Sequence, residues 1–140
     1  MSLTMSRAER EEFLAGLHVG VLGVASPDGR GPLTLPVWYT YLPGGTVNLS
    51  TGRGTRKALA IAAAGRFSLC AQDEALPYKY VTVEGPAVIE PSDLAERTAI
   101  ARRYLGQEAG DAWIADNPGA DDVVIRMRPE RWQTADFGKA

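Results

Sequence analysis

The order of apolar and polar positions along the chain predicts a series of short strands separated by turns. Residues 19–25 are almost continuously apolar and are expected to form a buried strand. Residues 32–41 carry bulky groups at both alternating sets of positions, so we expect one face to line a core and the other to meet a ligand or a second subunit. Further strands are expected at 46–51, 66–72, 78–89 and 123–128. Hairpin-short connections favour antiparallel pairing over βαβ units.

Helices are expected between these strands, at about residues 6–15, 55–64 and 92–105. Ser6, Thr55 and Ser92 are the expected N-caps, because each hydroxyl precedes a helical run. Gly65 stands where a C′ glycine belongs. Residues 106–122 are polar and glycine-rich apart from 112–114, and they have room for a further short helix. Strands interrupted by helices in this way predict an α+β, mainly β, single domain spanning residues 1–140.

Composition excludes several classes of function. The net charge of −2 gives no sign of a nucleic-acid surface. Cys70 and His18 are the only cysteine and histidine, so neither a disulfide framework nor a metal site is expected, and Cys70 is interpreted as a small core residue. No apolar stretch approaches the roughly 20 residues of a membrane span, and no signal peptide is evident. We therefore expect a cytoplasmic protein without membrane contact.

The stretch 49–57, Leu-Ser-Thr-Gly-Arg-Gly-Thr-Arg-Lys, leads from a strand through a glycine-rich turn into a helix. Arg56 and Lys57 fall in the first helical turn, where the helix dipole is positive and acidic residues are favoured. A bound anion would remove this conflict, because free N–H groups and cations together make a phosphate site. The alternative is a solvated basic turn. We favour the anion site, because the turn also supplies flexible backbone and a third cation, Arg53.

Two other positions have both a functional and a structural interpretation. Pro36 lies inside an expected strand and cannot donate to a ladder, so a bulge or an edge is expected there. The neighbouring backbone groups could then contact a ring system, or Pro36 could be an ordinary edge-strand proline. Lys79 lies between Tyr78 and Tyr80. It could reach an anion beside two stacking surfaces, or extend along an ordinary interface to solvent.

These pieces occur in a familiar order: Pro36-Val37-Trp38, then the 49–57 stretch, then an Ala-rich helix and Tyr-Val-Thr-Val-Glu-Gly at 80–85. From about residue 19 to 132 the chain resembles the flavin and deazaflavin split-barrel oxidoreductases, which are relatives of pyridoxamine 5'-phosphate oxidase and whose short branch uses coenzyme F420. The resemblance implies a six-stranded antiparallel split β-barrel with flanking helices, assembled as a homodimer.

The resemblance also implies which residues bind the cofactor. The deazaflavin ring would lie against Pro36, Val37, Trp38, Ser50 and Thr51. The phosphate and part of the tail would be held by Arg53, Thr55, Arg56 and Lys57. The other subunit of the homodimer would supply Pro77, Tyr78 and Lys79.

The main hypothesis is an F420-dependent oxidoreductase that passes a hydride to a small organic acceptor. The sequence offers little acid–base machinery and no catalytic side chain can be named, which favours chemistry carried by a cofactor. The first alternative is an FMN-binding oxidoreductase of the pyridoxamine-phosphate-oxidase type, although the sequence ends at Ala140 without the longer C-terminal substrate-binding part of those oxidases. The second is a non-catalytic carrier of a flavin, a deazaflavin or haem. Haem fits least well, because His18 is the only imidazole.

Overall fold

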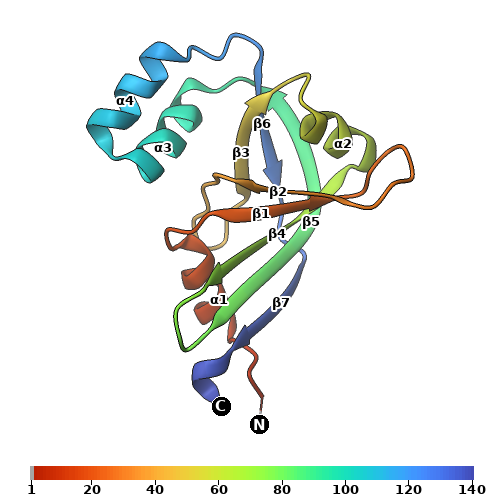
Figure 1. Ribbon diagram of the computed structural model, residues 1–140, viewed down its shortest axis with the longest axis vertical. Helices are drawn as coiled ribbons and strands as arrows, with labels where there is room; N and C mark the ends of the chain where they lie inside the picture. Colours follow the sequence, from red (N-terminus) through yellow and green to blue (C-terminus); the bar gives the residue numbers. More distant parts are fainter. Residues whose placement is uncertain (1) are drawn as a thin grey trace.

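Seven strands form one curled antiparallel sheet in the computed structural model, which describes residues 2–140 (Figure 1). The strand order is β2-β1-β4-β5-β6-β3, and β7 pairs with β5 beside that path. The strands are β1 Gly20–Val24, β2 Leu33–Val37, β3 Val47–Gly52, β4 Arg66–Asp73, β5 Lys79–Pro91, β6 Asp122–Met127 and β7 Arg131–Asp136. All six predicted strands are present. The seventh, β7, was not predicted.

The long strand β5 organises the sheet and is the most extended arrow in Figure 1. One edge of β5 pairs with β4, and the other edge pairs first with β7 and then with β6. Between β6 and β7 the chain makes a short irregular step, the β6–β7 jog, at residues 128–130. There the N–H of Arg128 donates to Pro86 O and the N–H of Glu130 donates to Glu84 O, both at 2.9 Å. A Cβ on Gly85 would lie 1.8 Å from the Arg128 carbonyl oxygen. Gly85 therefore permits a backbone approach that no other residue allows.

The strand predicted at 32–41 is interrupted in the structure. The interruption marks the seam of the barrel, which is the place where the first and last strands of the strand order meet. Strand β2 ends at Val37, and the Tyr39 N–H donates to the Tyr104 hydroxyl (3.2 Å) instead of a neighbouring strand. At Thr40 the chain pairs again, now with Asn48 of β3, through N–H···O bonds of 3.1 and 3.0 Å. The two ends of the strand order are joined by this bridge. Pro36 pairs with Val21 in an edge strand without a bulge.

Within residues 2–140, four α-helices and one short 3₁₀ helix accompany the sheet. They are α1 Arg7–Ala15, α2 Arg56–Ala64, α3 Leu94–Leu105, α4 Gln107–Asp116 and the 3₁₀ helix Phe137–Lys139. The capping box of Ser6 and Glu9 is formed, and α2 has the predicted cap Thr55 and a left-handed Gly65 (φ 74°). The N-cap of α3 is Asp93, not Ser92, because β5 continues through Pro91 and delays the helix start.

One hydrophobic core lies inside the curled sheet. The inward-facing strand residues, such as Leu22, Leu69 and Ile125, are fully buried, and Ile61 of α2 packs into the same cluster. Cys70 is half-buried, so its interpretation as a core residue was wrong. It pairs with Val21 on the outer face of the sheet, because neighbouring strand residues point to opposite faces. None of the helices within residues 2–140 is long and apolar enough to cross a membrane.

Candidate functional site

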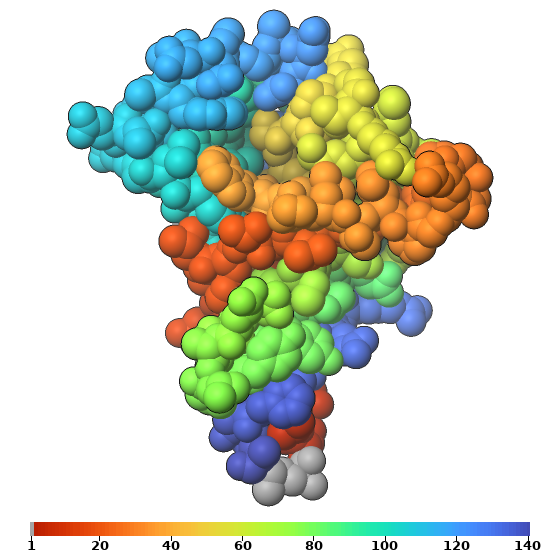
Figure 2. All heavy atoms as spheres, viewed as in Figure 1, coloured from red at the N-terminus to blue at the C-terminus, as the bar shows by residue number. Residues whose placement is uncertain are grey.

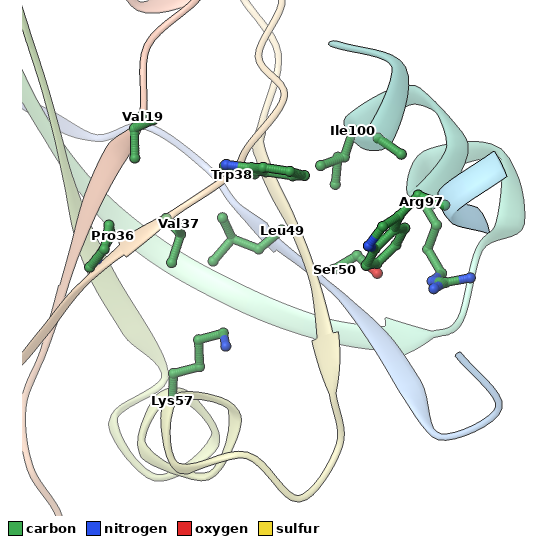
Figure 3. A pocket seen from close by; sticks show the side chains of 11 residues that line it. Val19, Pro36, Val37, Trp38, Leu49, Ser50, Lys57, Arg97 and Ile100 are labelled. Carbon is green, nitrogen blue, oxygen red and sulfur yellow. The ribbon is translucent and has the colours of Figure 1, made fainter. Parts of the chain in front are cut away.

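A cavity of about 360 Å³ opens beside the seam of the barrel, between β2, β3 and helices α2, α3 and α4. In Figure 2 the surface is hollowed where the yellow, cyan and orange segments meet. The lining residues are Val19, Pro36, Val37, Trp38, Leu49, Ser50, Lys57, Arg97, Ile100, Ala101 and Trp113. The strand break after Val37 turns the Trp38 indole toward this cavity (Figure 3).

Five of the predicted cofactor-binding residues lie together here: Pro36, Val37, Trp38, Ser50 and Lys57. Figure 3 shows Lys57 across the cavity from Trp38, with Ser50 farther along β3. The Ser50 hydroxyl is buried and has no hydrogen-bond partner within residues 2–140. A buried hydroxyl without a hydrogen-bond partner lowers the stability of the fold, so the Ser50 hydroxyl is suited to form a hydrogen bond with a polar group of a ligand.

Four other predicted residues, Thr51, Arg53, Thr55 and Arg56, lie between the end of β3 and the first residue of α2 and do not line the cavity. Thr55 Oγ1 accepts from the Ala58 N–H (3.3 Å), donates to Gly52 O (2.9 Å) and lies 3.3 Å from Thr51 Oγ1. The two threonines therefore shape the turn and cap the helix.

The start of α2 has an excess of positive charge. Its first turn contains no acidic residue, and the part of the chain that the structure describes offers no salt bridge to Arg53, Arg56 or Lys57. One carboxyl group that this charge influences is that of Asp28, in the β1–β2 turn. The Ser26 hydroxyl, the Arg30 N–H and the charge of Arg56 hold the pKa of that carboxyl below its ordinary value.

These features fit a ligand that has a planar ring and an anionic tail. Lys57, Arg53 and Arg56 bring cations to a helix N-terminus, where a phosphate is favoured. Trp38 keeps 38% of its surface exposed, and Ser50 supplies an unused hydroxyl. The only ionisable residues that line the cavity are Lys57 and Arg97, so the described residues place no carboxylate or imidazole there for acid–base work.

The remaining predicted residues, Pro77, Tyr78 and Lys79, lie far from the cavity within one chain. Their loop joins β4 to β5 near α1, at the opposite end of the sheet from α2 (Figure 1). The Tyr78 hydroxyl donates to Gln72 Oε1 (3.0 Å). Lys79 lines a second cavity of about 460 Å³ together with acidic residues, among them Asp73.

The sequence analysis missed the wall supplied by α3 and α4. Arg97 is 4% exposed and donates from Nε to Asp122 Oδ2 (2.8 Å), from Nη1 to Pro118 O (3.0 Å) and from Nη2 to Asn117 O (2.6 Å). It therefore fastens the loop after α4 to α3. The available signal was the apolar group 112–114, isolated in an otherwise polar stretch, which includes Trp113.

A curled antiparallel barrel with a ligand-sized cavity at its seam is a small-molecule-binding split-barrel domain. The family model of pyridoxamine 5'-phosphate oxidase matches residues 6–136, and the chain belongs to this family. The comparison with curated proteins found no match.

Solved structures share the fold. The conserved hypothetical protein Rv2991 from Mycobacterium tuberculosis is 25% identical with a TM-score of 0.82, over 99% of this chain and 89% of that one. A structure named F420 reductase is 24% identical with a TM-score of 0.71, over 88% and 94%. An FAD-binding protein from Mesorhizobium loti is 20% identical with a TM-score of 0.65, over 93% and 92%.

Proposed function

We propose that this protein is an F420-dependent oxidoreductase that transfers a hydride between the deazaflavin and a small organic acceptor. The observation that carries the proposal is a single cavity lined by a half-exposed indole (Trp38), an unpartnered hydroxyl (Ser50) and a cation without a salt-bridge partner among the described residues (Lys57). When bound, the deazaflavin would supply the hydride chemistry. The chain's own residues would bind and orient it.

Each lining residue has a definite role in this proposal. Lys57 binds the phosphate, assisted by Arg53, Arg56 and the N-terminus of α2. Residues 36–38 pack along the ring, and the Ser50 hydroxyl donates to or accepts from its polar edge.

The charge around α2 favours F420 over FMN. FMN offers its terminal phosphate alone, whereas F420, as the family resemblance implies, carries a phosphate diester followed by glutamates. Arg53 and Arg56 are exposed and can engage such carboxylates beyond the cavity. Each exposed pair contributes only about 0.2–1 kcal/mol, so the preference has to come from several pairs together. Such pairs weaken with added salt.

Paired titrations of F420 and FMN at low and high salt test the assignment. We expect F420 to bind more tightly at low salt, and the difference to shrink at high salt. FMN binding as tightly as F420 at low salt would overturn the assignment and favour the flavin alternative. Stopped-flow measurements of the oxidation of bound reduced cofactor by candidate acceptors distinguish an enzyme from a carrier. An enzyme would oxidise the cofactor faster than the same acceptor oxidises free cofactor, whereas a carrier would not.

The proposal includes a homodimer. Leu76, at the tip of the β4–β5 loop, is 90% exposed, and Val21 on the outer sheet face is 41% exposed. A second copy packed on this face would cover both and could bring Pro77, Tyr78 and Lys79 to its partner's cavity. Light scattering at micromolar concentration tests the assembly. A mass near that of one 15.0 kDa chain would exclude it.

A further inference from the structure

The α3–α4 helical pair forms a wall of the cavity to which the cofactor assignment gives no role. Ile100, Ala101 and Trp113 line the cavity from this wall. The two helices touch closely at Gly110, where a Cβ would lie 2.8 Å from the backbone of Arg102. Trp113 follows Gly110 by about one helical turn, so its indole stands on the part of α4 that packs closely against α3.

The cavity contains two half-exposed indoles, each supported on one face. Trp38 stacks on Tyr104, with ring centroids 4.9 Å apart and planes 6° from parallel. Trp113 has the guanidinium of Arg97 over its ring, 5.7 Å from the centroid. Trp38 nevertheless stays 38% exposed and Trp113 43% exposed. Aromatic surface held rigid in this way and left open to a cavity is suited to stacking on a planar ligand.

The wall carries no free charge, because the guanidinium of Arg97 is already committed. Three of its nitrogens donate to Asp122, Pro118 and Asn117. Lys57, across the cavity, has no salt-bridge partner among the residues described. The cavity thus has a cationic side at α2 and an apolar aromatic side at α3 and α4. Figure 3 shows Arg97 and Ile100 grouped on one side and Lys57 on the other.

We infer that Trp113 is a specificity-determining residue that stacks on the acceptor, and that the acceptor is a planar, uncharged, conjugated molecule. This inference rests on the proposed function, because it assumes that the cofactor occupies the side of Lys57 and Pro36. It assigns the opposite wall to the second substrate. Ile100 and Ala101 complete that surface with aliphatic groups.

Phenazine is a suitable probe, because it is planar, uncharged and conjugated. Equilibrium dialysis measures its binding to the protein with and without saturating oxidised F420. We expect phenazine to bind the F420-loaded protein, and Trp113→Ala to raise its Kd about 3- to 10-fold. Trp113→Phe keeps a stacking ring and should retain most of the affinity. Leu105→Ala, which removes a 37% exposed side chain of the same helical pair outside the cavity, is the matched control.

The outcomes separate the two proposals. Displacement of F420 by phenazine, or an equal loss of F420 and phenazine affinity in Trp113→Ala, would place Trp113 in the cofactor site and overturn the inference. Phenazine affinity unchanged in Trp113→Ala would overturn it as well. A wild-type protein that binds phenazine through Trp113 but binds no deazaflavin would overturn the proposed function and still support the stacking wall.

Discussion

The ring of Trp38 stacks on that of Tyr104, and the Tyr104 hydroxyl donates to His18 O at 2.6 Å. The same hydroxyl accepts from the N–H of Tyr39 at 3.2 Å. One side chain of α3 therefore binds the backbone next to Val19 and next to Trp38, which both line the cavity, and supports the Trp38 indole. The seam of the barrel depends on a partner 65 residues further along the chain.

Replacing Tyr104 by phenylalanine tests this relationship. Tyr104→Phe keeps the stack on Trp38 but leaves His18 O and the Tyr39 N–H without their partner. Unsatisfied buried backbone groups cost about 1–3 kcal/mol, so we expect a loss of unfolding free energy in that range. Urea denaturation measures it. Tyr104→Leu, which also removes the stack, should lose more. Wild-type stability in Tyr104→Phe would show that water replaces the hydroxyl at no cost.

The parts of the fold that could be predicted are those with local causes. The caps of α1 and α2 depend on residues three or four positions apart, and the strands alternate apolar positions with period two. The basic first turn of α2 was visible for the same reason. Five residues that the family resemblance implied as cofactor-binding do line one cavity, because they lie on β2, directly after β2, on β3 and on α2, where the chain patterns are clear.

The parts that could not be predicted have long-range causes. Strand β2 ends because the Tyr39 N–H donates to the Tyr104 hydroxyl of α3, and no local sequence pattern indicates this hydrogen bond. Strand β7 exists because β5 offers it a free edge beyond the jog at Gly85. Arg97 belongs to the cavity wall through contacts with Asn117 and Asp122, which follow a whole further helix.

Gly85→Ala should disrupt the sheet. Its Cβ would lie 1.8 Å from the Arg128 carbonyl oxygen, so the β6–β7 jog has to move away from β5. We expect a destabilisation above about 4 kcal/mol, or failure to fold, because backbone on both sides opposes the shift. Thermal unfolding measures the effect. Gly31→Ala is the matched control, since nothing lies within 4 Å of its Cβ. Equal stability of the two variants would contradict the close approach.

Glu9 should stabilise the folded protein at neutral pH and lose this contribution in acid. Its carboxylate accepts from Lys139 Nζ (2.7 Å) and from the Ser6 N–H (2.8 Å), which lowers the pKa from 4.5 to about 2. A carboxyl whose pKa is lowered on folding stabilises the protein fully above 4.5 and loses that effect as the pH falls toward 2. The melting temperature of Glu9→Gln should therefore lie below that of the wild type at pH 7 and converge with it near pH 2. A gap independent of pH would show that the carboxylate charge is not the cause.

Lys57 is expected to contribute to cofactor binding and not to the stability of the fold. Lys57→Ala removes the cation of the cavity and should raise the Kd of F420 about 10- to 150-fold, because a charge-assisted contact contributes about 1.5–3 kcal/mol. The apo protein should be as stable as the wild type or slightly more stable, since a cation in the first turn of α2 opposes the helix dipole. Cofactor titration and apo thermal unfolding measure the two effects.

A control variant removes the same charge elsewhere. Arg131 is exposed at the start of β7 and does not line the cavity, so Arg131→Ala lowers the net charge equally without touching the cavity. If general attraction of an anionic cofactor were responsible, Arg131→Ala and Lys57→Ala would weaken binding alike, and both effects would fade with salt. If Lys57 binds the phosphate directly, Lys57→Ala alone loses affinity. Unchanged affinity together with a lower melting temperature in Lys57→Ala would instead make Lys57 a structural residue, because the cation would then stabilise α2 rather than a ligand.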